Sequence, residues 1–208
     1  MDYLEEIAYR KEILDRAYKG IRPTKEERMW LCTHSYFNEA LGYPYYGISV
    51  EHIKEKQWYK LRFTVEEVSY HKDVLIQISV ASSKGQIFTP PEMKDMMWQE
   101  RTEKPFRIIC MEAKMGEEYE IAYYSPWGIF DIAYRLEMTT GSKDVIAYEP
   151  SNVLLSLAML REQISDNKVR FRCNSASNMD FKALVFTLEW IEIDGKPSEE
   201  ELAFYRHK

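Results

Sequence analysis

Several charged and aromatic side chains in the second half of the chain have the chemistry of an anion site. Guanidinium groups bind carboxylates and phosphates through paired, charge-assisted hydrogen bonds, and tyrosines supply aromatic walls. Strands that curl around a common concavity would bring such side chains together, with Asp131 or Glu189 as an acid or base. Strands in an open sheet would instead leave them as cross-strand ion pairs on a solvated face. The candidate ligand-binding residues are Asp131, Tyr134, Arg135, Arg170, Arg172 and Glu189.

The motifs of familiar enzymes are absent from the sequence. The chain has no glycine-rich phosphate loop, no nucleophile elbow, no zinc-protease helix motif and no Cys-x-x-Cys pair. Cys32 and His34 lie in a predicted helix at a spacing that turns their side chains about 200° apart, so they cannot close on one metal ion. His52 and His71 fall in predicted loops without a nucleophile at a suitable spacing. We therefore expect no metal, no cofactor and no catalytic residue.

Acidic residues near the end of the chain suggest a surface for a partner. A net charge of −6 disfavours nucleic acid, and an acidic surface steers association with a basic protein. Alternatively, these acids only keep a strand end and the first turn of a final helix solvated. A second candidate surface holds Met96, Met97 and Trp98, which suit either an adaptable partner groove or the protein's own core. The acidic candidates are Glu189, Glu192, Asp194, Glu199, Glu200 and Glu201.

Length and composition predict one folded domain over residues 1–208. A chain of 208 residues with 45% apolar residues can bury a substantial core. The sequence contains no apolar run long enough to span a bilayer, and its first residues are acidic where a signal peptide would be basic and then apolar. We therefore expect a cytoplasmic protein without a membrane partner. Cys32, Cys110 and Cys173 are far apart, which is typical of buried free thiols in a reducing compartment.

Five helices are predicted from periodicity and capping residues. Apolar residues follow one helical stripe over 3–19 and end at Gly20, and the capping box from Thr24 to Glu27 begins a second helix that ends at Gly42. These two form a helical hairpin over 1–42 that packs on the sheet. Residues 92–101 predict a short helix, 152–164 a buried crossover helix, and 198–206 a short C-terminal helix.

Alternating polarity predicts about eight mainly antiparallel strands between residues 58 and 193. They are expected as a hairpin over 58–81, a four-stranded meander over 106–148 and a final hairpin over 168–193. In the hairpin at 118–138, a turn at 125–128 would place Tyr123 opposite Phe130 and Glu118 opposite Arg135. The fold class is therefore α+β, with one twisted or curled sheet.

Composition and missing motifs favour a non-catalytic protein that binds a macromolecule through an acidic, aromatic-rich surface, as immunity and inhibitor proteins do. That comparison is one of class only. The alternative is a small-molecule-binding or enzymatic domain that holds an anionic ligand with arginine and tyrosine in a concave sheet face.

Overall fold

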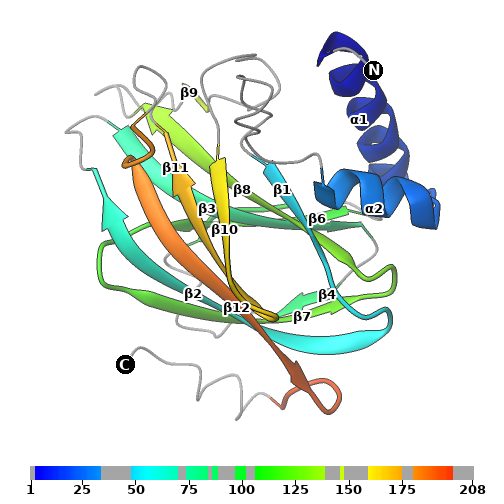
Figure 1. The fold of residues 1–208 in the computed structure, drawn as a ribbon. Helices are drawn as coiled ribbons and strands as arrows, with labels where there is room; N and C mark the ends of the chain where they lie inside the picture. The colour runs from blue at the N-terminus through cyan, green and yellow to red at the C-terminus, as the bar shows by residue number, and fades with distance from the viewer. Residues whose placement is uncertain are drawn as a thin grey trace.

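The structure, a computed structural model, describes residues 3–33, 48–69, 74–83, 86–88, 97–101, 106–138, 146–147, 159–174 and 180–198. These residues form two helices and twelve strands (Figure 1). The strands make two antiparallel sheets, each of six strands. The α+β class and the antiparallel pairing agree with the sequence prediction. Neither described helix is long and apolar enough to cross a membrane.

The first sheet has the strand order β1-β8-β3-β6-β5, and β9 pairs with β8. Its strands are β1 (Ile48–His52), β3 (Val74–Ser83), β5 (Met97–Arg101), β6 (Phe106–Glu112), β8 (Ile129–Met138) and β9 (Ile146–Ala147). The second sheet has the order β10-β11-β12-β2-β7-β4. Its strands are β2 (Gln57–Val68), β4 (Gln86–Phe88), β7 (Glu118–Ser125), β10 (Met159–Ser165), β11 (Lys168–Cys173) and β12 (Leu184–Ile193).

The main core lies between the two sheets. Alternate residues of each long strand point into it, as period-two sequences do when one face is buried. On β2 these are Leu61, Phe63 and Val65, and all three are essentially inaccessible to solvent. Phe130 and Tyr134 of β8 enter the same core from the other sheet. The sequence prediction of the inward faces is therefore confirmed for these strands, and large side chains fill the interior.

Two helices, α1 (Tyr3–Tyr18) and α2 (Lys25–Thr33), cover part of the first sheet. Gly20 adopts a φ of 84° and closes α1 with backbone bonds from Gly20 to Ala17 and from Ile21 to Arg16. Thr24 begins α2 with the predicted capping box: its hydroxyl accepts the Glu27 N–H at 3.2 Å, while the Glu27 carboxylate accepts the Thr24 N–H at 2.8 Å. The helices and the sheet share a second apolar cluster of Ile13, Ala17, Leu31, Val50, Trp127 and Ile129.

The predicted hairpin at 118–138 is wrong, because its two strands belong to different sheets. β7 pairs with β2 and β4, whereas β8 pairs with β1, β3 and β9. Glu118 consequently lies opposite Thr64 and not opposite Arg135. Tyr123 and Phe130 do meet, with ring centroids 5.2 Å apart, but they meet across the core. The alternating pattern indicates which face of a strand is buried. Two strands with buried faces can lie side by side in one sheet, or they can face each other from two packed sheets.

The other predicted strand connections divide in the same way. β2 and β3, predicted as one hairpin, lie in separate sheets, and so do β6 and β7 of the predicted meander. The prediction of one sheet with about eight strands is therefore wrong. The final hairpin is confirmed, since β11 pairs with β12 along its whole length.

Two predicted helices overlap segments that are strands. Residues 97–101 form β5 and residues 159–165 form β10, where helices were predicted over 92–101 and 152–164. Short apolar runs do not distinguish a helix from a strand, and pairing with β6 and β11 decides here for the strand. Residues 92–96 and 152–158 lie outside the described residues, as do 34–42 of the second predicted helix and 199–206 of the last.

Candidate functional site

One edge of each sheet lies beside the other, and a charged pair joins them. β1 ends the first sheet and β10 ends the second. Glu51 lies opposite Phe130, so it shares the inward face of β1, and Arg161 lies opposite Phe171, so it shares the inward face of β10. Sheet pairing thus directs an acid and a base toward each other across the gap between the layers.

The contact between Glu51 and Arg161 is bidentate. Arg161 Nε donates to Glu51 Oε1 at 3.0 Å, and Nη2 donates to Oε2 at 2.8 Å. The Ser49 hydroxyl also donates to Glu51 Oε1 at 2.8 Å. The Glu51 side chain is 4% exposed and the Arg161 side chain 19% exposed, so the carboxylate is desolvated and depends on these donors.

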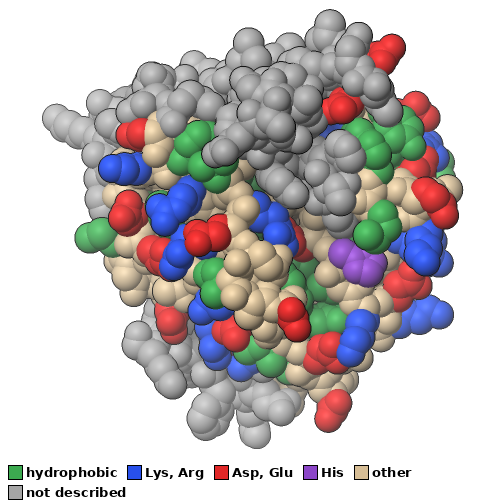
Figure 2. Space-filling view, viewed as in Figure 1, with side chains coloured by type: hydrophobic (Ala, Val, Ile, Leu, Met, Phe, Trp, Pro, Cys, Tyr) green, Lys and Arg blue, Asp and Glu red, His purple; other side chains and the backbone are tan. Residues whose placement is uncertain are grey.

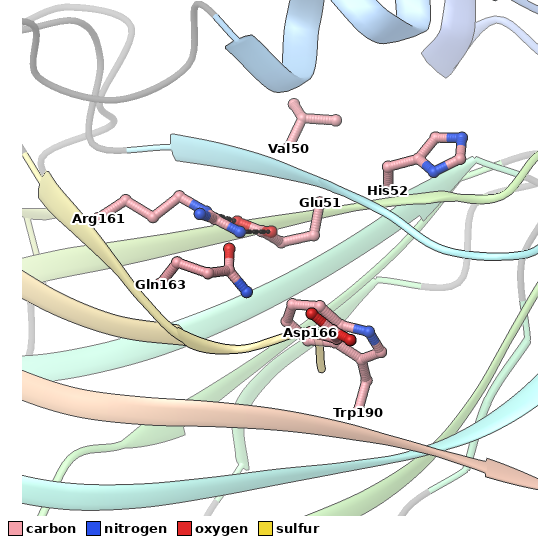
Figure 3. A pocket seen from close by; sticks show the side chains of 7 residues that line it. All are labelled: Val50, Glu51, His52, Arg161, Gln163, Asp166 and Trp190. Atoms are coloured by element: carbon pink, nitrogen blue, oxygen red, sulfur yellow. Dashed lines mark hydrogen bonds and ion pairs between the residues drawn. The ribbon is translucent and has the colours of Figure 1, made fainter. Parts of the chain in front are cut away.

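A cleft of about 270 Å³ opens beside this pair, as Figure 3 shows. Glu51, Arg161 and Gln163 point toward one another across it, whereas Val50 and His52 project from β1 on the side away from Arg161. Known ligand pockets usually measure about 300–1,000 Å³, so this cleft is slightly smaller than that range. Its size restricts a ligand to about one side chain or a small metabolite. The lining residues are Val50, Glu51, His52, Arg161, Gln163, Asp166 and Trp190.

Trp190 forms the apolar wall of the cleft. It is half-buried and packs edge-to-face on Phe130, with ring centroids 6.4 Å apart. Asn167, in the turn between β10 and β11, holds that turn against β12, because its side chain donates to the Trp190 carbonyl at 3.1 Å and its own carbonyl accepts the Trp190 N–H at 2.9 Å. The neighbouring Asp166 is exposed at the cleft beside Trp190.

Neither the Ser49 hydroxyl nor the His52 imidazole is placed for nucleophilic chemistry in this cleft. The Ser49 hydroxyl is fully buried and directed to Glu51, so it offers no accessible nucleophile. His52 points away from the acid and the base that could activate it. Among the residues that the structure describes, no group of three His, Cys, Asp or Glu side chains is placed to hold a metal ion.

The predicted anion-site residues lie on both sheets and do not converge. Tyr134 is buried in the core, where its hydroxyl donates a hydrogen bond to the Asn174 side-chain oxygen at 2.6 Å. Asp131 lies on the opposite face of β8, across from Val50, and is also buried. Arg135, in the same strand, lies opposite Gln77 of β3, and its side chain is outside the described part of the structure. Tyr134 is thus separated from Asp131 by the sheet itself.

Arg170, Arg172 and Glu189 belong to the outer face of the second sheet. A bulge opposite Val185 and Phe186 leaves Glu66 as an extra residue on β2. Arg170 donates from Nε to Glu66 at 2.9 Å and from Nη1 to Glu162 at 3.3 Å, and the Glu66 bond is the main cause of the raised pKa of Arg170. This is the arrangement of cross-strand ion pairs on a solvated face that the sequence left as the alternative.

The same outer face carries a ladder of charges in one row across the strands. Arg62 donates to Glu120 at 2.6 Å and to Glu189 at 3.3 Å. The hydrogen bond that Arg62 donates to Glu120 raises the pKa of Arg62, although partial burial opposes it. On the side of the molecule turned to the viewer in Figure 2, acidic and basic side chains are correspondingly interspersed.

The acidic candidates for a partner surface differ in their surroundings. Glu192 is paired with Lys54 at 2.6 Å, and that hydrogen bond raises the pKa of Lys54. Asp194 is exposed beyond the end of β12. The candidates Glu199, Glu200, Glu201 and Met96 lie outside the described residues. Met97 and Trp98 form part of β5, of which only the backbone is described.

Sequence reasoning missed the pair of Glu51 and Arg161 as well as the role of Trp190. The two charged residues are 110 positions apart, and neither has a motif around it. Only the strand phases of residues 48–52 and 159–165 could have indicated them, because a charge at an inward position of an edge strand calls for a partner. A comparison with protein-family models, curated proteins and solved structures finds no match for this chain.

Proposed function

We propose that this protein binds a basic macromolecular partner and that its role is recognition and not turnover. The observation that carries this proposal is an acidic and aromatic surface at the open end of β12. Ile193 lies opposite Trp58, and Trp58 packs against Tyr124 of the next strand at a tilt of 38°, with ring centroids 5.2 Å apart. Both aromatic rings are half-exposed, and Asp194 follows directly. Partly exposed aromatic side chains beside charges are enriched at protein interfaces.

The other charged groups of the second sheet are paired with one another, which distinguishes them from Asp194 at the end of β12. Arg62, Arg170 and their carboxylate partners are already engaged with one another. Glu192 is partly neutralised by Lys54, whereas Asp194 has no ion pair with any side chain that the structure describes. Asp194 is therefore the acid at this end whose field reaches solvent with the least compensation.

The interior supports recognition over a ligand-filled sheet cavity. Between the sheets, the core is occupied by fully buried aromatic and aliphatic side chains such as Phe63, Phe171 and Phe186. A concave face lined by the predicted tyrosine and arginines would have required these residues to leave space. The anion-binding alternative therefore has less support than a surface interaction.

The first experiment is capture of partners on the full-length protein from a lysate of its host, at low and at high salt. A basic partner that elutes as salt rises supports the proposal, because screening shortens the Debye length from about 10 Å at 0.1 M to about 3 Å at 1 M. Charge reversal then tests the surface. Asp194→Lys combined with Glu192→Lys should slow association by about tenfold at low salt.

The matched control is Asp15→Lys on α1, which also reverses one exposed acid but lies away from β12. It should change the association rate much less than Asp194→Lys alone. An association rate that ignores both the reversals at β12 and the ionic strength would contradict the proposal.

A further inference from the structure

We propose that the cleft between β1 and β10 is a binding site for an organic cation, namely a guanidinium or ammonium group. The cleft is distinct from the aromatic end of β12 formed by Trp58 and Tyr124, and none of the residues predicted from sequence as ligand-binding lines it. Its charge, its hydrogen-bonding groups and its aromatic wall each favour a positive ligand.

The charge of the lining is negative once its internal pair is taken into account. Arg161 and Glu51 balance each other through two hydrogen bonds. Asp166 remains, and no Lys or Arg within the described ranges lies at ion-pair distance from it. An anion would have to compete with Glu51 for Arg161, whereas a cation meets an uncompensated carboxylate.

The hydrogen-bonding groups of the cleft are mainly acceptors. The Gln163 side-chain nitrogen donates to the carbonyls of Ser165 and Lys168 and so helps to close the turn after β10. Its oxygen is thereby turned to the cleft, on the side of Arg161 in Figure 3. Gln163 and Asp166 then offer oxygen atoms to a ligand with several N–H donors, as guanidinium and ammonium have.

Trp190 provides the third element of recognition. The indole is the aromatic ring that attracts cations most strongly through its face. Its position is fixed by Phe130 on one side and by the Asn167 clamp on its backbone. A cation beside Trp190 is therefore within reach of Asp166 and Gln163, which line the same cleft.

A single basic side chain is the ligand that best fits a cleft of about 270 Å³. The source rests on the proposed function: a basic partner would insert an arginine or lysine here while its surface meets the acidic end of β12. Glu192 and Trp190 lie on the same face of β12, opposite Tyr59 and Leu61, so the acidic end of β12 and the cleft share one face of this strand, whereas Trp58 belongs to its other face. A free small cation would use the same three contacts.

The test is an NMR titration of the full-length protein that follows the indole N–H of Trp190, assigned by its loss in Trp190→Phe. The probes are ethylguanidinium, its neutral analogue ethylurea, and the blocked tripeptide Gly-Arg-Gly. We expect ethylguanidinium and the tripeptide to shift the resonance in a saturable way and ethylurea to leave it unchanged. Tighter binding of the tripeptide would identify a side chain as the source, and equal binding a free cation.

Two isosteric variants locate the site. Asp166→Asn should weaken binding of ethylguanidinium by about two- to fivefold, the range of an exposed ion pair. Asp15→Asn makes the same change of charge on α1 and should leave the affinity unchanged. Because Asp166 is exposed in a turn, its substitution leaves the core intact, so the result does not depend on the tolerance of Trp190 to replacement.

The cation site is refuted if ethylurea binds as well as ethylguanidinium, if neither cationic probe shifts Trp190, or if Asp166→Asn and Asp15→Asn behave alike. These failures are separable from failure of the proposed function. A basic partner whose association depends on Asp194 but not on Asp166 would retain the proposed function and exclude the cleft from it.

Discussion

Replacement of Arg161 by methionine tests whether the charged pair holds the two sheet edges together. The variant keeps most of the aliphatic stem but removes both donors to Glu51, whose side chain is 4% exposed. Removing one partner of a fully buried ion pair lowers the free energy of unfolding by about 3–5 kcal/mol, because the other charge stays buried without compensation. Ser49 still donates one hydrogen bond, and Arg161 itself is 19% exposed. We therefore expect a loss at the lower end, about 3 kcal/mol in the free energy of unfolding.

A double-mutant cycle separates the pair from the packing of its side chains. Glu51→Gln removes the buried charge, so Arg161→Met in that background should cost only about 1 kcal/mol. The assay is urea unfolding at neutral pH, followed by tryptophan fluorescence. The matched control is Arg170→Met on β11, whose partners Glu66 and Glu162 lie on the solvated face, and it should cost no more than about 1 kcal/mol. Equal losses at Arg161 and Arg170, or a loss at Arg161 that is unchanged by Glu51→Gln, would refute the reasoning.

Three further predictions concern the turns and the helices. Gly128→Ala should destabilise more than Gly116→Ala by about 1 kcal/mol or more, because both have positive φ but only the Gly128 Cβ would lie 2.6 Å from a backbone oxygen; equal losses would contradict this. Thr24→Ala should cost about 1 kcal/mol in unfolding free energy and Thr24→Ser far less, since serine retains the cap. A hydrogen bond from Arg22 lowers the pKa of Glu55 below its usual 4.5. The contribution of Glu55 to the free energy of unfolding is therefore complete above pH 4.5 and is lost as the pH falls through the lowered pKa. Glu55→Gln should reduce the loss of stability on acidification, and an unchanged acid limb would exclude Glu55 as its source.

The sequence predicted the buried faces of the strands better than the neighbours of those strands. Leu61, Phe63 and Val65 were placed correctly because hydrophobic alternation is a local property of one strand. The partner of that strand is not a local property. β2 pairs with β7 and β12, and its contact with β12 joins residues more than a hundred positions apart. A strand buries the same face whether its sequence neighbour pairs with it in one sheet or packs on it from a second sheet. The hydrophobic alternation therefore could not distinguish one sheet from two.

The candidate site was not accessible to the same reasoning. Motif searches find residues that act together only when they are close in sequence, whereas Glu51 and Arg161 meet through the edges of two sheets. The predicted anion site grouped Arg170 with Tyr134 because a curled sheet could have brought an anion anchor and an aromatic wall to one concavity. The structure places Arg170 on an outer face and Tyr134 in the core. The alternation of polar and apolar residues along a strand does not indicate which sheet that strand joins.

The reversal after β7 explains how the chain passes between the sheets. The Ser125 hydroxyl donates to the Ile129 carbonyl at 2.9 Å and accepts the Trp127 and Ile129 N–H groups at 3.3 Å. Gly128 is held against the end of β1 by the bond from the Ile53 N–H to its carbonyl at 2.8 Å. These contacts make the turn a corner between layers, in place of the ladder closure that its proline and glycine predicted.

That corner also connects the helices to the cleft. Trp127 belongs to the apolar cluster that α1 and α2 form with Val50 of β1. The next residue on β1, Glu51, faces the opposite way and binds Arg161. Adjacent side chains of one strand therefore belong to the helix-covered layer and to the cleft, as the alternation of a strand requires. Among the described strands, β1 is an edge strand that pairs with β8 alone, so the helices supply its second support. The position of Glu51 in the cleft thus depends on the packing of the N-terminal helices as well as on its bond to Arg161.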